Sequence, residues 1–260
     1  MVTTTQLAFN SYTVREMLAG PQDIKSTFER LRGSGYEAVE LDLDRLFPLM
    51  DVAELKDILD DIGMTAFSAH TKFENLEREF SRSVSNFKTL GLEYVVVPTL
   101  PGERFCKDEQ GWLTGTVMLA SIGKKLSREG IKFAYHNHSK EFEKFGSKRA
   151  MEIVFDEENW SDFLVEIDTC WVQHAGADPA QWIRKYSGRV PLVHVKDLGI
   201  IENKPVTMEV GNGNMNWSYI LDASRISGVE WYIVEQDDCL IDPVESLTKS
   251  KAFLSGVGIF

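Results

Sequence analysis

The chain has 260 residues, of which 43% are hydrophobic and 26% are charged, and its mean hydropathy is −0.20. This composition is typical of a globular protein with a sizeable core, and no apolar run reaches the roughly 18 residues that a membrane span requires. The 40 acidic residues outnumber the 28 basic ones and give a net charge of −12, which argues against binding to the phosphate backbone of a nucleic acid.

A glycine followed at once by a strand-like run recurs along the chain, and its first three copies, at Gly35, Gly63 and Gly91, are 28 residues apart. Each glycine follows a segment of helical character, where it supplies the left-handed conformation that caps a helix. The spacing is about the size of one strand–helix unit. With three runs that lack the leading glycine, the pattern predicts eight strands, at residues 6–10, 36–42, 64–70, 92–98, 131–138, 162–168, 190–196 and 229–235.

The segments between these runs have helical periodicity. Apolar residues recur at steps of three and four from Val52 to Ile62 and again from Phe73 to Leu90, which is the spacing of one buried helical face. We therefore predict one helix over each of these two ranges.

The order of the predicted elements indicates a single (β/α)8 TIM barrel that takes up residues 1–260 as one domain. The strand-like runs are almost continuously apolar, as expected for parallel strands covered on both faces. Eight strand–helix units in this length suit such a barrel. A doubly wound open sheet is the main alternative, but no GxGxxG motif follows the first strand, where a dinucleotide-binding fold would carry it.

Ionisable residues gather at the predicted carboxyl ends of the strands, where TIM barrels carry their active sites. These residues are His70, His136, His138, Asp168, His194 and Glu235, with Glu141 in the loop that follows the fifth strand. They form an oxygen and nitrogen ligand set that suits Mn²⁺, Mg²⁺, Co²⁺ or Zn²⁺, without a sulfur ligand. One histidine at a strand end is commonly a hydrogen-bonded core residue. Packing does not explain Asp168, His194 and Glu235 together, because unpaired buried charges are costly.

Several neighbouring residues have two interpretations. Lys196 lies two residues after His194, on the same side of the strand, and we expect it to bind substrate rather than to pair with an acid only. Trp171 either stacks on a sugar or covers the barrel mouth. Glu40 is either a site residue or the partner of a buried arginine. His174 lies beyond the sixth strand, and we expect it to lie outside the site.

The motifs at these strand ends resemble the sugar phosphate isomerase/epimerase family, the xylose-isomerase-like TIM barrel group that includes inosose dehydratases and ketose 3-epimerases. The resemblance extends from Phe9 to the last predicted helix. The segments that carry it are Tyr135-His-Asn-His-Ser-Lys-Glu-Phe-Glu, Asp168-Thr-Cys-Trp, Arg189-Val-Pro-Leu-Val-His-Val-Lys-Asp, Val210-Gly-Asn-Gly and Ile233-Val-Glu-Gln-Asp-Asp. The family often has Gly-Glu-Gly where this chain has Gly211-Asn-Gly.

The resemblance implies one divalent metal, usually Mn²⁺, bound by a glutamate, an aspartate, a histidine and a second glutamate. Asp168, His194 and Glu235 match three of these ligands. In the subgroup with the pattern His-Asn-His-x-x-Glu-Phe, the fourth matches Glu141. His136 stands where ketose epimerases have a glutamate base. We therefore expect His136 or His138 to act in proton transfer together with Glu235, and we expect His70, Trp171 and Lys196 to contact substrate.

The implied activity is that of a sugar isomerase or epimerase that removes a proton next to a carbonyl and forms an enediolate. The expected substrate is a keto-sugar or 3-oxo-glycoside, a small carbohydrate bound without a phosphate group, because the loops after the seventh and eighth strands are acidic. Elimination from a 3-oxo-glycoside or inosose through the same enediolate, by a lyase or dehydratase, is the alternative. The sequence is compatible with a homo-oligomer.

The sequence also bears on two further candidate functions and on the location of the protein. The endonuclease IV branch needs three zinc ions and a basic surface, which the charge of −12 argues against. A non-catalytic sugar-binding barrel, or a subunit of a larger complex, would not need convergent metal-type ligands. The three cysteines form no CxxC pair and residues 1–10 carry no secretory signal pattern, so we expect a cytoplasmic protein with free thiols.

Overall fold

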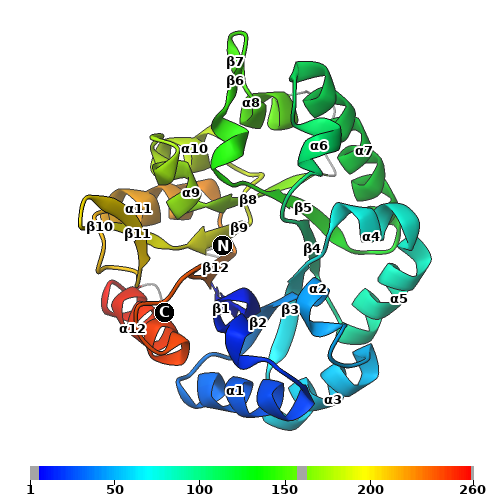
Figure 1. Cartoon of the computed structure of the whole chain (residues 1–260), viewed down its shortest axis with the longest axis vertical. Coiled ribbons are helices and arrows are strands. Elements are labelled where there is room, and N and C mark those ends of the chain that lie inside the picture. Colours follow the sequence, from blue (N-terminus) through cyan, green and yellow to red (C-terminus); the bar gives the residue numbers. More distant parts are fainter. Residues whose placement is uncertain (1–5, 157–162, 259–260) are drawn as a thin grey trace.

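Eight parallel strands close into a barrel in the computed structural model, which describes residues 6–156 and 163–258 (Figure 1). Around the barrel the strands follow the order β1, β12, β9, β8, β5, β4, β3, β2, and β2 pairs with β1 to close the ring. Their bounds are β1 Gln6–Asn10, β2 Ala38–Asp42, β3 Thr65–His70, β4 Tyr94–Val97, β5 Lys132–His136, β8 Leu164–Asp168, β9 Leu192–Val195 and β12 Trp231–Val234.

The fold predicted from the sequence is therefore confirmed: every observed barrel strand lies within a predicted one. Strand β1 has the predicted bounds, and each of the other strands is one or two residues shorter than its prediction at one end or at both. Residue 162, the predicted start of the sixth strand, lies outside the described residues.

Helices surround the barrel as an outer ring (Figure 1). Their apolar faces pack on the outside of the strands, which explains the continuous apolar runs in the strand sequences. No helix in the described part of the chain has the length and apolar character needed to cross a membrane. The longer helices are α1 Pro21–Gly33, α3 Val52–Ile62, α5 Phe80–Leu90, α7 Glu109–Arg128, α11 Trp217–Ser227 and α12 Pro243–Gly256, and the shorter ones are α2 Leu43–Leu46, α4 Phe73–Arg78, α6 Gly102–Phe105, α8 Ala150–Phe155, α9 Thr169–His174 and α10 Pro179–Lys185.

One of the two predicted helices has the predicted bounds and the other is divided. Helix α3 spans Val52–Ile62 and ends at Gly63, whose φ of 65° and ψ of 40° give the expected left-handed cap. The predicted helix from Phe73 to Leu90 is instead α4 and α5, separated at Glu79, which has φ −126° and ψ 35°. The four-residue step from Leu76 to Phe80 keeps the apolar periodicity across this break, so the pattern could not reveal it.

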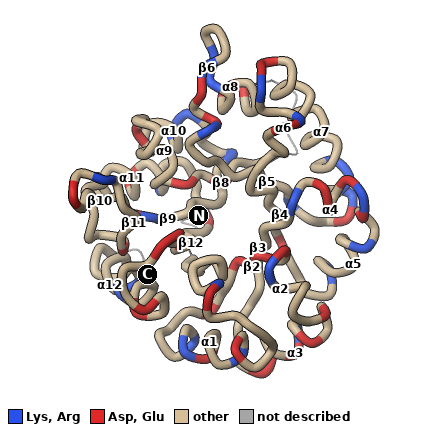
Figure 2. Tube along the Cα trace, viewed as in Figure 1, with Lys and Arg blue, Asp and Glu red and all other residues tan. Residues whose placement is uncertain are grey.

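The interior of the barrel has an apolar lower part and a polar upper part. Phe67 of β3 stacks on Trp231 of β12 with ring centroids 3.7 Å apart, and small residues such as Ala8, Ala38 and Ala134 make room for this pair. Toward the carboxyl ends of the strands, charged residues occupy the interior instead. Seen along the barrel, acidic positions near β2 and β12 and a basic position beside β9 lie close to the centre (Figure 2).

Asp197 anchors the loop that follows the seventh barrel strand. It begins the hairpin of β10 (Asp197–Ile201) and β11 (Lys204–Met208). Its buried carboxylate accepts hydrogen bonds from the backbone N–H of Gly211 at 2.8 Å and of Gly213 at 3.1 Å, and from the indole N–H of Trp217 at 2.6 Å. A Cβ at Gly213 would lie 2.2 Å from this carboxylate. The Gly211-Asn-Gly segment therefore wraps around Asp197, and this contact fixes the loop beside the barrel mouth.

We expect Asp197→Ala to destabilise the protein by about 3 kcal/mol, because it leaves several buried donors without their charged acceptor. Urea denaturation followed by circular dichroism measures this loss. Asp238→Ala, which removes a largely exposed carboxylate near the same mouth, is the control and should change the free energy of unfolding by less than about 0.5 kcal/mol. Equal stabilities of the two variants would contradict the anchoring role.

Candidate active site

A pocket of about 230 Å³ opens at the carboxyl ends of the strands. It is lined by Tyr12, Asp42, His70, Pro98, Thr99, His136, His138, Trp171, Glu235 and Asp237. Five of these residues were site candidates from the sequence: His70, His136, His138, Trp171 and Glu235. A larger hollow of about 670 Å³ lies between α2, α3, α4 and α5, but none of the sequence-predicted site residues lines it. The chemistry of the chain is therefore concentrated in the smaller, central pocket.

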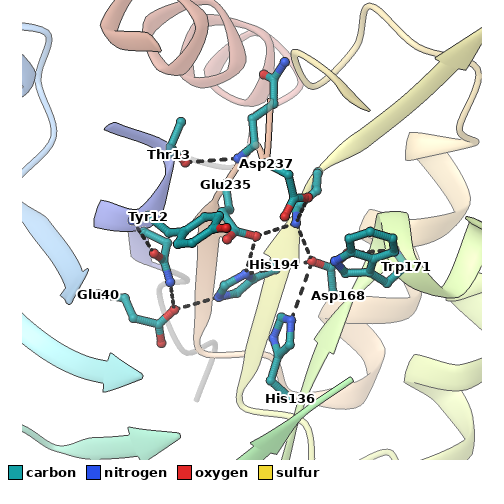
Figure 3. Close-up of polar contacts among 12 residues, drawn as sticks. Tyr12, Thr13, Glu40, His136, Asp168, Trp171, His194, Glu235 and Asp237 are labelled. Carbon is teal, nitrogen blue, oxygen red and sulfur yellow. Dashed lines mark hydrogen bonds and ion pairs between the residues drawn. The ribbon is translucent and has the colours of Figure 1, made fainter. Parts of the chain in front are cut away.

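Three of the four predicted metal ligands converge beneath this pocket, and we call Asp168, His194 and Glu235 the mouth group (Figure 3). They come from the ends of β8 and β9 and from the residue after β12. The Nδ1 atom of His194 lies 3.3 Å from Glu235 Oε2 and 4.0 Å from Asp168 Oδ2. All three side chains are buried. Two carboxylates and one imidazole form an open, incomplete ligand set of the kind that catalytic metals use.

Glu141, the fourth predicted ligand, does not join this group. It lies in a short 3₁₀ turn, η2 (Ser139–Phe142), and its two oxygens accept hydrogen bonds from the Tyr135 hydroxyl at 2.6 Å and from the His138 backbone N–H at 2.8 Å. Burial raises the pKa of the Glu141 carboxyl. In this arrangement Glu141 fixes the loop that carries His138.

Lys196 lies wholly buried among carboxylates rather than along the pocket wall. Its Nζ is 3.0 Å from Asp168 Oδ2 and 2.7 Å from Asp237 Oδ2, and it also contacts Glu235. Burial alone would lower the pKa of Lys196, but these carboxylates raise it well above its ordinary value. The ammonium thus supplies positive charge beside the two carboxylates of the mouth group. The donor set of that group, two carboxylates and one imidazole, fits a divalent metal.

A second group of metal-type ligands lies deeper in the barrel and shares His194 with the mouth group. This interior group consists of His70, His136, Glu166 and His194, with one ligand atom of each within 4.8 Å of the others. The Oε2 atom of Glu166 is 2.7 Å from His70 Nε2, 2.8 Å from His136 Nδ1 and 3.3 Å from His194 Nε2. Buried histidines and carboxylates of this kind could hold a metal ion.

Glu40 lies beside the interior group and completes its hydrogen bonds. It accepts from His194 Nε2 at 2.6 Å, from Asn10 at 2.8 Å and from Ser68 at 2.7 Å. Of the two interpretations of Glu40, site residue and partner of a buried arginine, the second is not seen, because its partners among the described residues are His194, His70, Asn10 and Ser68. Sequence reasoning missed Glu166 and Asp237. Glu166 precedes Asp168 by two residues in an apolar strand, and the alternation of a strand was the signal that could have identified it.

His136 and His138 both line the pocket, with ring centroids 5.0 Å apart, but their hydrogen bonds differ. The Nδ1 atom of His136 is bonded to Glu166, whereas the buried Nδ1 atom of His138 has no hydrogen-bond partner among the described residues. Burial and then the positive charge of Lys196 lower the pKa of His138 to about 3, so its ring is neutral at physiological pH. His138 is therefore a neutral imidazole that lines the pocket together with Glu235 of the mouth group.

Aromatic residues complete the wall of the pocket. Trp171, at the start of α9, lies half-buried with its ring centroid 5.5 Å from that of His138, and both lie at the mouth as the sequence predicts. His174 is exposed on the same helix and belongs to neither ligand group, as expected.

The charges of the interior group predict a pH dependence of stability in protein stripped of divalent ions. Burial alone would lower the pKa of His70, but Glu40 and Glu166 raise it from 6.5 to about 10. A group whose pKa is higher in the folded than in the unfolded state stabilises the fold. The full contribution is present below the pKa of the unfolded state, and it is lost as the pH rises through the pKa of the folded state. We expect the stability advantage of wild type over His70→Gln to decrease between about pH 6.5 and 10. Urea denaturation across this range measures it, and a constant difference would contradict the charged assignment.

Comparisons with known proteins agree with this fold. The model of the xylose isomerase-like TIM barrel family matches residues 28–255. An inosose dehydratase of Clostridium perfringens is 21% identical over 238 residues, with 79% of each chain covered. A sugar phosphate isomerase/epimerase of Parabacteroides distasonis has a similar structure, with a TM-score of 0.81, 24% identity and coverage of 98% of this chain and 95% of that one.

A second similar structure contains a metal. The IOLI protein with a bound zinc atom superposes with a TM-score of 0.75 at 16% identity, and the match covers 97% of this chain and 98% of that one. At these identities the solved structures establish the fold alone. The family match spans most of the chain, its curated relative is an enzyme, and the resemblance seen in the motifs is confirmed. The chain belongs to the xylose isomerase-like TIM barrel family.

Proposed function

We propose that this protein is a divalent-metal-dependent sugar isomerase or epimerase that removes a proton next to a carbonyl group. The observation that carries the proposal is the imidazole of His138, which lines the same pocket as Glu235 of the mouth group and makes no side-chain hydrogen bond through Nδ1 to the described residues. A neutral imidazole can accept a proton from a substrate carbon. The position beside a metal-type ligand set is where such a proton would become acidic enough to remove.

Asp168, His194 and Glu235 would hold the cation, with Mn²⁺ as the first candidate and Mg²⁺, Co²⁺ or Zn²⁺ as alternatives. Glu141 remains a fourth ligand predicted from the resemblance, and it would have to release Tyr135 and the His138 amide to bind. When bound, the cation would polarise the substrate carbonyl and stabilise the negative charge that develops on it.

Side chains of the protein transfer the proton that is removed from the substrate. The imidazole of His138 takes it, and Trp171 and His70, which line the same pocket, position the sugar. His136, whose Nδ1 is engaged by Glu166, orients the substrate through its other nitrogen. Returning the proton to the opposite face gives an epimer, whereas returning it to the neighbouring carbon gives an isomer. Glu235 is the next candidate for the second proton-transfer group.

Dehydration is the second candidate function, and one observation favours it. A curated relative, the protein of Clostridium perfringens described above, is an inosose dehydratase. Loss of a leaving group from the carbon next to the abstracted proton would convert the same first step into an elimination. The free thiols of Cys106, Cys170 and Cys239 support a cytoplasmic location for either activity.

The experiment that tests the proposal is proton exchange in D₂O. Metal-loaded protein is incubated with ketoses, inososes and 3-oxo-glycosides, and NMR identifies the carbon that gains deuterium and any new epimer, isomer or alkene. We expect His138→Gln to slow exchange by about 10²-fold or more, the scale of general base catalysis. His174→Gln, a change of an exposed histidine on α9, is the matched control and should leave the rate unchanged. Unaltered exchange in His138→Gln would remove His138 from the proton-transfer step.

The charge of the pocket supports a substrate without phosphate. Asp42, Glu235 and Asp237 line it, and no lysine or arginine is among its lining residues. A phosphate dianion would meet repulsion there, because the nearby Lys196 is already engaged by three carboxylates.

We therefore expect sugar phosphates and inorganic phosphate at millimolar concentration to inhibit poorly in comparison with neutral keto-sugars. Inhibition constants measured by competition in the exchange assay test this preference. Tighter competitive inhibition by a sugar phosphate than by its unphosphorylated counterpart would show that the substrate carries a phosphate group.

A further inference from the structure

We propose that the barrel holds two divalent cations, with the second in the interior group of His70, His136, Glu166 and His194, and with His194 shared between the two positions. This second site goes beyond the proposed function, which requires only the mouth group. Its three imidazole nitrogens and one carboxylate suit Zn²⁺, or Co²⁺ as its spectroscopic substitute.

The interior group lies close to the geometry of a four-coordinate ion, although His194 Nε2 is hydrogen-bonded to Glu40 at 2.6 Å and would have to leave it to bind. Three ring nitrogens lie 2.7, 2.8 and 3.3 Å from the same oxygen, Glu166 Oε2. Ligands of a tetrahedral zinc lie roughly 3.3 Å from one another, since each bond is roughly 2.0–2.1 Å long. Small outward movements of two histidines would therefore open the position. The other oxygen of Glu166 is buried and has no hydrogen-bond partner among the described residues, so the carboxylate retains unused acceptor capacity.

Buried carboxylates around His194 outnumber the lysine and arginine side chains that contact them. Glu40, Glu166, Asp168 and Glu235 are buried, and Asp237 joins them through Lys196. Lys196 is the one lysine or arginine that contacts these five carboxylates within the described residues. Five carboxylates and one ammonium leave an excess of negative charge, which a second bound cation would reduce.

The two ring nitrogens of His194 lie toward the two proposed cation positions. Its Nε2 lies 3.3 Å from Glu166 in the interior, and its Nδ1 lies 3.3 Å from Glu235 at the mouth. A ring that binds both cations has lost both ring protons, so binding of the second cation releases a proton to the solvent. The interior ion would also fix His136 through Nδ1, which leaves His138 as the free imidazole of the pair.

Metal counting on matched variants tests the proposal. The full chain is saturated with Zn²⁺, freed of loosely bound metal by gel filtration and analysed by plasma mass spectrometry. We expect two ions in wild type, one in His70→Gln, one in Glu166→Gln and one in Glu235→Gln, and neither ion in His194→Ala. Ser68→Ala, which removes a hydrogen bond to Glu40 in the same cluster but no ligand atom, is the control and should retain both ions. Circular dichroism checks that each variant is folded.

Cobalt titration of the wild-type protein provides a measurement that needs no variant. We expect two equivalents of Co²⁺ to bind, one of them with the intense visible absorption of a tetrahedral site. A single equivalent would overturn the proposal whatever the variants do.

The other outcomes are distinguishable from one another. One ion that is lost in Glu235→Gln but retained in His70→Gln and Glu166→Gln would overturn the second site and leave the proposed function intact. One ion that is lost in His70→Gln and Glu166→Gln but retained in Glu235→Gln would overturn both the two-ion proposal and the mouth ligand set.

Discussion

The structure depends on how the upper interior of the barrel compensates its buried carboxylates. Glu40, Glu166 and Asp168 are completely buried, where an unpaired negative charge would cost several kcal/mol. They are tolerated because imidazole nitrogens and one ammonium lie within hydrogen-bonding distance of them. Removal of one member leaves the others without a partner, so these residues act as a network rather than as independent contacts.

The rest of the fold holds this network in register. Asp168 pairs with His194 between β8 and β9, and His136 pairs with Glu166 between β5 and β8, so that hydrogen bonding of the strands sets the spacing of the ionisable groups. Below them, the stacked pair of Phe67 and Trp231 fills the barrel with apolar material. The polar groups are thereby confined to the end that opens to solvent, which is where a substrate can reach them.

Several parts of the site could be identified from single residues. Histidines and acids at strand ends stand out against apolar strands, which is why His70, His136, His138, Asp168, His194 and Glu235 were recognised. Lys196 was recognised as well, but its partners were not, because its three carboxylates come from two different parts of the chain. Glu141 is the opposite case, a residue whose contacts the sequence does not reveal. Its place in a motif does not reveal that both its oxygens face Tyr135 and the His138 amide rather than the mouth group.

The sequence by itself determined the eight strands, their parallel arrangement and the end of the barrel at which ionisable residues gather, because apolar runs, capping glycines and element order are local properties of the chain. Only the tertiary structure decided which of those residues meet. Closure of the ring brings Glu40 of β2 within 2.6 Å of His194, 154 positions away in the sequence. The direction of each side chain inside a closed barrel depends on strand stagger and on the neighbouring strands, and neither is written in the sequence of a single strand.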